Sequence, residues 1–192
     1  MKIWKMAAVA ATALAALPAS AATFVVDAQN NSSSGGTALS TIALTAGQVF
    51  KVSSSLNDLW SAGALPRFSD ANGLIADRFA TAADDSGQPV GTQIGTNFGA
   101  YSQFGHTSVF GKLVGRINGV YQDVGANFQG AAWQTGNLEL FYWDSNNDDN
   151  TGQISFNISA IPEPASWAFM IAGFGIVGAA ARRRQTGKVV TA

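Results

Sequence analysis

Residues 152–161, near the C-terminal end of the chain, alternate apolar and polar side chains with a period of two. Ile154, Phe156 and Ile158 fall on one face, and the opposite face carries Gln153, Ser155, Asn157 and Ser159. Successive side chains of an extended strand point to opposite faces, whereas helical neighbours recur every three or four residues. The segment therefore predicts a β-strand with one buried face and one face in water.

The segment just before it, GNLELFYWDS, extends this pattern. Leu138, Leu140 and Tyr142 share one face, and the opposite face also carries large apolar groups at Phe141 and Trp143. A strand that is apolar on both faces is covered on both sides. We therefore expect a central strand here.

Three more segments have strand-like patterns, and no part of the central region has a long 3.6-residue period. Within SVFGKLVGRING, Val109, Leu113 and Ile117 fall on one face, with glycines between them. Short strands separated by turn residues predict an all-β fold, an antiparallel β-sandwich. The weakly patterned stretch from Leu56 to Ala100 is expected to form long loops, where binding sites usually lie. The three segments are residues 47–55, 108–119 and 120–128.

Composition and charge exclude several classes of protein. Hydrophobic residues make up 47% of the chain and charged residues 12%, which is too apolar for a disordered protein. The chain has no cysteine, so it has neither disulfides nor thiolate ligands. Residues 23–160 contain five basic and eleven acidic residues, a net charge of −6 with histidine neutral. That charge disfavours nucleic acid and suits a cation.

The first 22 residues are typical of a secretory signal peptide. Lys2 and Lys5 precede the uncharged apolar run from Ala7 to Leu17, and Pro18 ends it. The tripeptide at residues 19–21, Ala-Ser-Ala, is an A-x-A cleavage pattern. An alanine-rich core helix would explain neither the basic start nor the cleavage pattern. We expect export through the Sec translocon, removal of residues 1–22 by signal peptidase, and a mature chain that begins near Thr23.

The C-terminal end raises a choice between a membrane anchor, a core helix and a removable sorting signal. The uncharged run from Trp167 to Ala181 is short for a spanning helix, which needs about 20 residues. Three arginines follow it directly, whereas a core helix interleaves its charges along one face. By the positive-inside rule they would hold the tail in the cytoplasm. Two prolines before the run forbid a regular helix and leave an extended segment.

The order of these parts resembles the PEP-CTERM sorting signal of the PEPxxWA type. In that family an exosortase, a membrane-embedded cysteine protease, reads the signal in Gram-negative bacteria that make exopolysaccharide and biofilm. The resemblance implies that residues 161–192 form a PEP motif, a transmembrane helix and an Arg-rich cytoplasmic tail. It also implies transient anchoring in the inner membrane, then the cell surface or extracellular matrix. The matching residues are Pro162, Glu163, Pro164, Trp167, Ala168, Arg182, Arg183 and Arg184.

The segment WDSNNDDNTG, residues 143–152, concentrates Asp and Asn between two predicted strands. Calcium takes six to eight oxygen ligands from carboxylates, amides and carbonyls, and such a loop can supply several. It is not an EF-hand, because Asp149 stands where that loop needs glycine and strands flank it. Asp and Asn are also ordinary turn formers. The residues alone leave both interpretations open, a calcium site and a hairpin turn.

A second resemblance covers residues 47–158. LVGRIN, VGANF, GNLELFYWD and DDNTGQISFNI, in this order, are similar to the calcium-dependent galactose-binding lectins of the LecA type, and NDLWSAG fits that family's first loop. The resemblance implies a jelly-roll-like form of the β-sandwich for residues 23–160. It also implies calcium as the cofactor and extracellular polysaccharide as a partner, with the hydroxyl groups of the sugar bound to calcium.

The lectin resemblance assigns ligands residue by residue. Asp144 matches the family's first calcium aspartate, and Asp149 and Asn150 match its asparagine pair. Ala62 matches the residue whose backbone carbonyl completes the site. The loop is shorter here, and Asn147 is the nearest match to the family's threonine ligand.

The sugar-contacting residues of the lectin family are matched less closely. Its histidine and glutamine have no counterpart in this chain. The loop FSDANG, residues 68–73, takes their place and offers Asp70 and Asn72, beside Asp144 and Asp149, as carbohydrate-binding residues.

Other chemistry-bearing residues give no catalytic pattern. His106 is the only histidine and cannot form a multi-histidine metal site, and no G-x-S-x-G elbow supports a triad. Asp84 and Asp85 lie in a polar turn and are expected to be solvated. Trp60 and Trp143, like Trp133, suit either a sugar platform or a sandwich core. We therefore expect no catalytic residues and no enzyme activity.

Three functions follow from these observations. The first is an exported, exosortase-processed surface or matrix protein with a calcium-dependent carbohydrate-binding domain, associated with exopolysaccharide or biofilm. The second is a structural matrix protein without a discrete ligand site. The third is a polysaccharide hydrolase, which no carboxylate pair or triad supports.

Overall fold

The computed structural model describes residues 21–161 and 166–185 of the chain. These belong to two compact units, one within residues 19–161 and one that includes the C-terminal helix. Residues 1–20 of the predicted signal peptide, which was assigned to residues 1–22, and the Pro162-Glu163-Pro164 triplet lie outside the described residues. Within residues 21–161 the regular structure is entirely β, which confirms the predicted all-β class.

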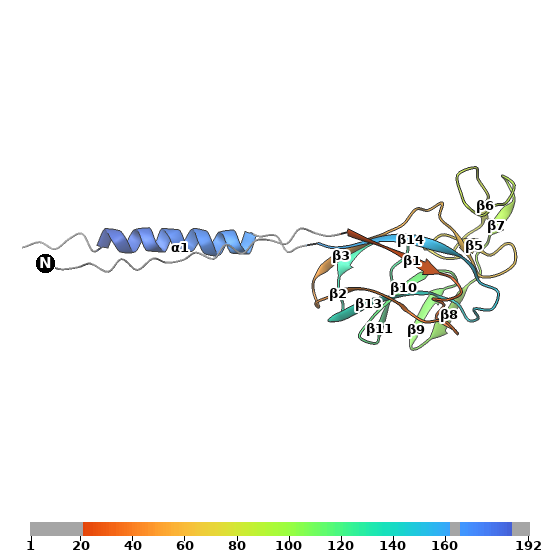
Figure 1. Ribbon diagram of the computed structural model, residues 1–192, viewed down its shortest axis with the longest axis horizontal. Helices are drawn as coiled ribbons and strands as arrows, with labels where there is room; N and C mark the ends of the chain where they lie inside the picture. The colour runs from red at the N-terminus through yellow and green to blue at the C-terminus, as the bar shows by residue number, and fades with distance from the viewer. Residues whose placement is uncertain (1–20, 162–165, 186–192) are drawn as a thin grey trace, which may run out of the picture. The chain divides into compact units, whose positions relative to one another are not determined.

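Two sheets with antiparallel strand pairs form the layers of the sandwich (Figure 1). The first has six strands in the order β12 (Asn127–Ala131), β3 (Val49–Ser53), β14 (Thr151–Ala160), β4 (Trp60–Ser61) and β5 (Phe68–Ser69), with β1 (Ala21–Asp27) paired to β14. The second has the order β11 (Val120–Asp123), β10 (Leu113–Ile117), β13 (Gly136–Tyr142) and β2 (Leu39–Leu44). Two hairpins complete this unit, β6 (Arg78–Phe79) with β7 (Gln93–Gly95) and β8 (Ala100–Gln103) with β9 (His106–Val109).

β14 organises the first sheet. It pairs with β1 over seven residues, from Ala21 opposite Ser159 to Asp27 opposite Gln153, and the two lie side by side in Figure 1. On its other edge it pairs with β3 near its end and with β4 at its start. The predicted start of the mature chain at Thr23 would keep five of the seven β1 pairs.

The hydrophobic core fills the space between the two sheets. The first sheet contributes Phe50, Trp60 and Phe156, and the second contributes Leu138, Leu140 and Tyr142, all fully buried. The predicted half-buried pattern of residues 152–161 is confirmed, because Ile154, Phe156 and Ile158 are all 0% exposed. β13 lies between β10 and β2, so its predicted central position is also confirmed.

Two of the strand predictions were wrong in extent. Residues 108–119 are not one strand, because a turn at Gly111 separates β9 from β10. Gly111 has a φ of +76°, and a Cβ there would lie 2.6 Å from the Ser69 hydroxyl oxygen, so the position requires glycine. Residues 120–128 likewise divide between β11 and β12, which belong to different sheets.

The region from Leu56 to Ala100 forms long loops, as predicted. Its strands β4 to β7 have only two or three residues each. A small satellite core of Leu59, Ala80 and Ile94 supports these loops. They are therefore held by packing and hydrogen bonds more than by extended strand pairing.

The helix α1 (Ser166–Gln185) contains Trp167, Ala168 and the three arginines of the sorting signal. In the part of the chain that the structure describes, no helix combines the length and the apolar character needed to cross a membrane.

The side chain that best tests the sandwich core is Phe156. It is fully buried on β14 and packs near Trp60, with ring centroids 6.0 Å apart. We expect Phe156→Ala to lower the free energy of unfolding by about 3–5 kcal/mol, measured by chemical denaturation, because it leaves a cavity in the core. The neighbouring-strand control Val25→Ala, at a side chain 43% exposed, should cost under about 1 kcal/mol. Equal losses would contradict this arrangement.

Candidate functional site

The loop from β13 to β14 crosses from the second sheet to the first and buries a polar side chain at each end. Asp144 follows Trp143 at its start and is 4% exposed, and Asn150 precedes β14 and is 3% exposed. The residues between these two ends are partly or fully exposed. The loop therefore directs its two terminal polar groups toward the interior.

The pairing of β4 with β14 brings a distant residue to this loop. Trp60 lies opposite Gly152, and Ser61 lies opposite Thr151. The next position along this antiparallel pairing therefore places Ala62 beside Asn150. Ala62 is 4% exposed. The strand register thus brings together two of the predicted calcium ligands that are far apart in sequence.

The segment after β1, residues 28–36, supports the loop from its other side. The Ser33 hydroxyl donates to the Asp144 carbonyl oxygen at 2.9 Å and accepts from the Asp144 amide at 3.0 Å. The Asn147 side-chain amide donates to the Gln29 carbonyl oxygen at 3.3 Å. Sequence reasoning missed Ser33, because its partner is 111 residues away and the polar run NNSSSGG indicates only a turn.

Asn150 holds an unpartnered acceptor. Its Nδ2 donates to the Ala28 carbonyl oxygen at 3.1 Å, which identifies the nitrogen of the amide. Its Oδ1 is buried and accepts no hydrogen bond among the described residues. A buried acceptor without a donor costs about 1–3 kcal/mol, so a donor or a cation at this atom would be favourable.

Two carboxylates lie near that acceptor. Burial raises the pKa of Asp144, and the negative charge of Asp149 raises it further, while the Ser145 amide and the Asn150 side chain oppose the shift. The Ser145 amide donates to Asp144 Oδ1 at 2.7 Å. The site therefore holds negative charge that the surrounding hydrogen bonds only partly compensate.

Asp149 forms the outer side of the site, with Arg67 next to it. Arg67 Nη1 lies 3.6 Å from Asp149 Oδ2 and donates to the Ala62 carbonyl oxygen at 3.2 Å. Gly63, with a φ of +114°, makes room for this arrangement, since a Cβ there would lie 2.3 Å from Asp149 Oδ2. Sequence reasoning did not single out Arg67, which reaches the site only through the fold of the loop.

Together these groups form a candidate cation site. The structure gathers the Ala62 carbonyl and the Asp144, Asp149 and Asn150 side chains, four of the five predicted ligands. Their oxygens are the carboxylate, amide and carbonyl donors that calcium prefers, and the unpartnered Asn150 Oδ1 fits a cation. The fifth, Asn147, directs its amide to Gln29 instead. No cluster of three or more His, Cys, Asp and Glu residues occurs in the described ranges.

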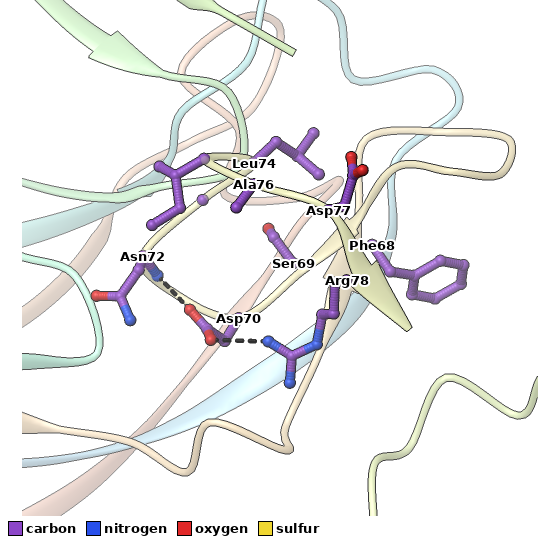
Figure 2. A pocket seen from close by; sticks show the side chains of 10 residues that line it. Phe68, Ser69, Asp70, Asn72, Leu74, Ala76, Asp77 and Arg78 are labelled. Atoms are coloured by element: carbon purple, nitrogen blue, oxygen red, sulfur yellow. Dashed lines mark hydrogen bonds and ion pairs between the residues drawn. The ribbon is translucent and has the colours of Figure 1, made fainter. Parts of the chain in front are cut away.

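The predicted sugar-contacting residues Asp70 and Asn72 line a separate cavity of about 190 Å³ (Figure 2). Asp70 accepts from the Asn72 amide at 2.7 Å and from Arg78 Nη1 at 2.9 Å, and both contacts are visible in the figure. Asn72 Oδ1 accepts from the Ala126 amide at 3.1 Å. Both side chains therefore hold the loop in shape, and a sugar contact for them stays a prediction.

The aromatic candidates pack inside the domain. Trp60 and Trp143 are fully buried and donate their indole N–H groups to the carbonyl oxygens of Gly111 and Tyr101. Trp133 packs partly buried against the core. For Trp60 and Trp143 the structure supports the core interpretation and not the sugar platform.

His106 and the acidic turn have structural partners. His106 Nε2 lies 2.9 Å from Asp123 Oδ1, and Lys112 Nζ lies 2.7 Å from the other oxygen of Asp123. In the turn, Asp84 is half-buried and accepts hydrogen bonds from Thr81 and Ser86. Asp85 accepts from the Leu59 amide.

Comparisons with known proteins support the predicted sorting signal. Residues 160–184 match the PEP-CTERM protein-sorting motif. The chain carries an exosortase sorting signal. Such a motif implies export, transient membrane anchoring and processing by an exosortase. A solved structure, the EclA N-terminal domain, described as a PllA-like lectin, is 18% identical with a TM-score of 0.45, over 72% of this chain and 95% of that chain. No curated protein matches the chain.

The support beneath the loop can be tested at Ser33. We expect Ser33→Ala to lower the free energy of unfolding by about 1–3 kcal/mol, because it leaves the buried amide and carbonyl of Asp144 without partners. Chemical denaturation measures the loss. Ser145→Ala, at an exposed position of the same loop, is the matched control and should change it by under about 0.5 kcal/mol. A neutral Ser33→Ala would show that the two contacts do not support the loop.

The Asp123 cluster predicts a pH dependence of stability. Burial works to raise the pKa of Asp123, but the hydrogen bonds with Lys112 and His106 outweigh it and hold the pKa below the ordinary value of an aspartate. The unfolded chain then binds more protons between the two pKa values, so this stabilisation is present above pH 3.8 and is lost as the pH falls through the folded pKa.

We expect Asp123→Asn to be less stable than wild type at pH 7 by about 1 kcal/mol, since the carboxylate is partly exposed. The difference should shrink as the pH falls below about 4, in denaturation curves recorded across that range. A difference that stays constant from pH 7 to pH 2 would contradict the assignment of the effect to the Asp123 charge.

Proposed function

We propose that this chain is an exported, exosortase-processed protein of the cell surface or extracellular matrix whose β-sandwich domain binds carbohydrate through calcium. The matched sorting motif supports the route, and the candidate cation site supports the ligand. The signal peptide would take the chain to the Sec translocon and signal peptidase. The helix would hold it in the inner membrane of a Gram-negative cell until an exosortase cuts near Pro164.

The main support for calcium binding is the position of Asn150 Oδ1, which accepts no hydrogen bond among the described residues and lies beside two carboxylates. A calcium ion there would be coordinated by Asn150 Oδ1, by the Asp144 and Asp149 carboxylates and by the Ala62 carbonyl oxygen. It would also stabilise the charged form of Asp144, whose pKa is raised first by burial and further by the negative charge of Asp149. Asn150 Oδ1 and the buried Asp144 carboxylate are less favourable without a cation, and a turn alone does not explain their burial.

Carbohydrate binding follows from the chemistry of such a site. Four protein ligands leave coordination positions of calcium open, because the ion takes six to eight oxygens. Bound calcium supplies a Lewis-acidic position for paired sugar hydroxyl groups. The exposed side of the site is formed by Asp149, whose side chain is 50% exposed, so a ligand can approach from solvent there.

The structural matrix protein is the second candidate. The bonds of Ser33 to Asp144 and of Asn147 to Gln29 favour it, because they build a stable turn without any ligand. The two functions differ in their response to calcium.

Asp144→Asn separates the two functions. We expect calcium to raise the melting temperature of the purified wild-type protein, with about 2.7 kcal/mol of stabilisation at 100 times its Kd. The variant should lose this response in thermal unfolding and calorimetric titration. Without calcium it should be at least as stable as wild type at pH 7, because an amide replaces a buried carboxylate whose pKa is raised.

The matched control is Asp148→Asn, which changes charge equally in the same loop at an exposed position. It should keep most of the calcium response. Equal calcium responses in wild type and Asp144→Asn would contradict the site. A calcium response without any calcium-dependent retention on a sugar array would leave the structural role as the function.

A further inference from the structure

Arg67 lies at the solvent side of the candidate site. Its Nη1 contacts the Ala62 carbonyl oxygen and Asp149, and its guanidinium carbon lies 4.7 Å from the centre of the Phe98 ring. The Arg67 side chain is 37% exposed and Phe98 is 41% exposed. A cation and an aromatic face therefore meet solvent at the rim of the site.

The ion pair of Arg67 is loose compared with the others in the domain. Arg78, Lys112 and Arg116 lie 2.9, 2.7 and 2.6 Å from their carboxylate partners, whereas Arg67 lies 3.6 Å from Asp149. A distance of 3.6 Å is too long for a hydrogen bond. Among the described residues, the hydrogen bond from Arg67 goes to the Ala62 carbonyl, and a guanidinium has five N–H donors.

Charge at the site depends on the cation. The carboxylates of Asp144 and Asp149 together balance one calcium ion, so Asp149 no longer compensates Arg67 once calcium is bound. The loaded site then carries a net positive charge at Arg67. Because the whole domain is acidic, any attraction for an anion has to come from this local charge, and only with calcium present.

We propose that the site selects acidic saccharides, with the carboxylate of a uronic acid residue paired to Arg67 while ring hydroxyl groups bind calcium. This rests on the proposed calcium-dependent carbohydrate binding. The planar guanidinium matches a carboxylate in a two-pronged geometry. Phe98, whose ring the guanidinium covers in part and which is 41% exposed, adds apolar surface beside it against which the C–H groups of a sugar ring would pack.

The test compares a uronic acid disaccharide with its carboxyl-reduced neutral counterpart, by calorimetry on the purified full-length protein in saturating calcium. We expect wild type to bind the acidic sugar about tenfold more tightly, the effect of one charge-assisted contact. Arg67→Gln should bring the two affinities within about twofold. Lys51→Gln removes an equal charge from an exposed position on β3 and should keep the preference.

Two further measurements distinguish a specific effect of Arg67 from misfolding of the variant or an indirect effect. Arg67→Gln should bind calcium alone more tightly than wild type, because a positive charge beside Asp149 is gone. Arg67→Lys keeps the charge without the planar fork and should retain part of the preference. A variant that had merely unfolded would lose calcium binding as well.

The outcomes separate the preference for acidic sugars from calcium-dependent carbohydrate binding in general. Equal binding of both sugars to wild type overturns the acidic preference and leaves calcium-dependent sugar binding intact. A preference that survives in Arg67→Gln overturns the role of Arg67. Binding of neither sugar by a protein that still responds to calcium overturns carbohydrate binding itself, and the inference with it.

Discussion

The pairing of β14 with strands on both of its edges is the constraint on which the rest of the domain depends. β1 covers one edge along seven residues, while β3 and β4 share the other. Because β1 comes first in the chain and β14 last, this pairing closes the sandwich by joining its two ends. It also fixes the register at Thr151 and Gly152, and with it the position of Asn150 and of every group around it.

The candidate site exists because the loop from β13 has to cross between the sheets at that fixed point. Crossing brings Asp144 and Asn150 below the surface, where polar groups are costly unless they are partnered. Ser33 and Ala28 satisfy the backbone of Asp144 and the amide nitrogen of Asn150, but Asn150 Oδ1 and the two carboxylates stay incompletely satisfied. The domain thus has incompletely satisfied polar groups at one place, which is typical of functional sites.

Sequence patterns predicted the parts of this fold that repeat locally. The alternation around Phe156 and Leu140 identified β14 and the central β13, because a buried face imposes a period of two. The turn at Gly111 was missed, since glycine within an apolar pattern signals a break and a continuous strand equally well. Ser33 and Arg67 were missed for a different reason. Their roles come from contacts across long sequence separations, which no local pattern encodes.

The sorting route and the chemistry of the site fit one another. Under the proposed function, two carboxylates and two neutral oxygens would form a calcium site of low ligand charge, and such sites in extracellular modules bind calcium with Kd values of about 10⁻⁴–10⁻³ M. Under the proposed function the domain would stay empty in the cytoplasm and load after export, where calcium is abundant. Arg67 would strengthen this coupling, because its charge beside Asp149 would oppose the cation and so raise the calcium concentration that loading requires. The same residue would turn the loaded site positive, so an acidic ligand would bind only in a compartment that supplies calcium.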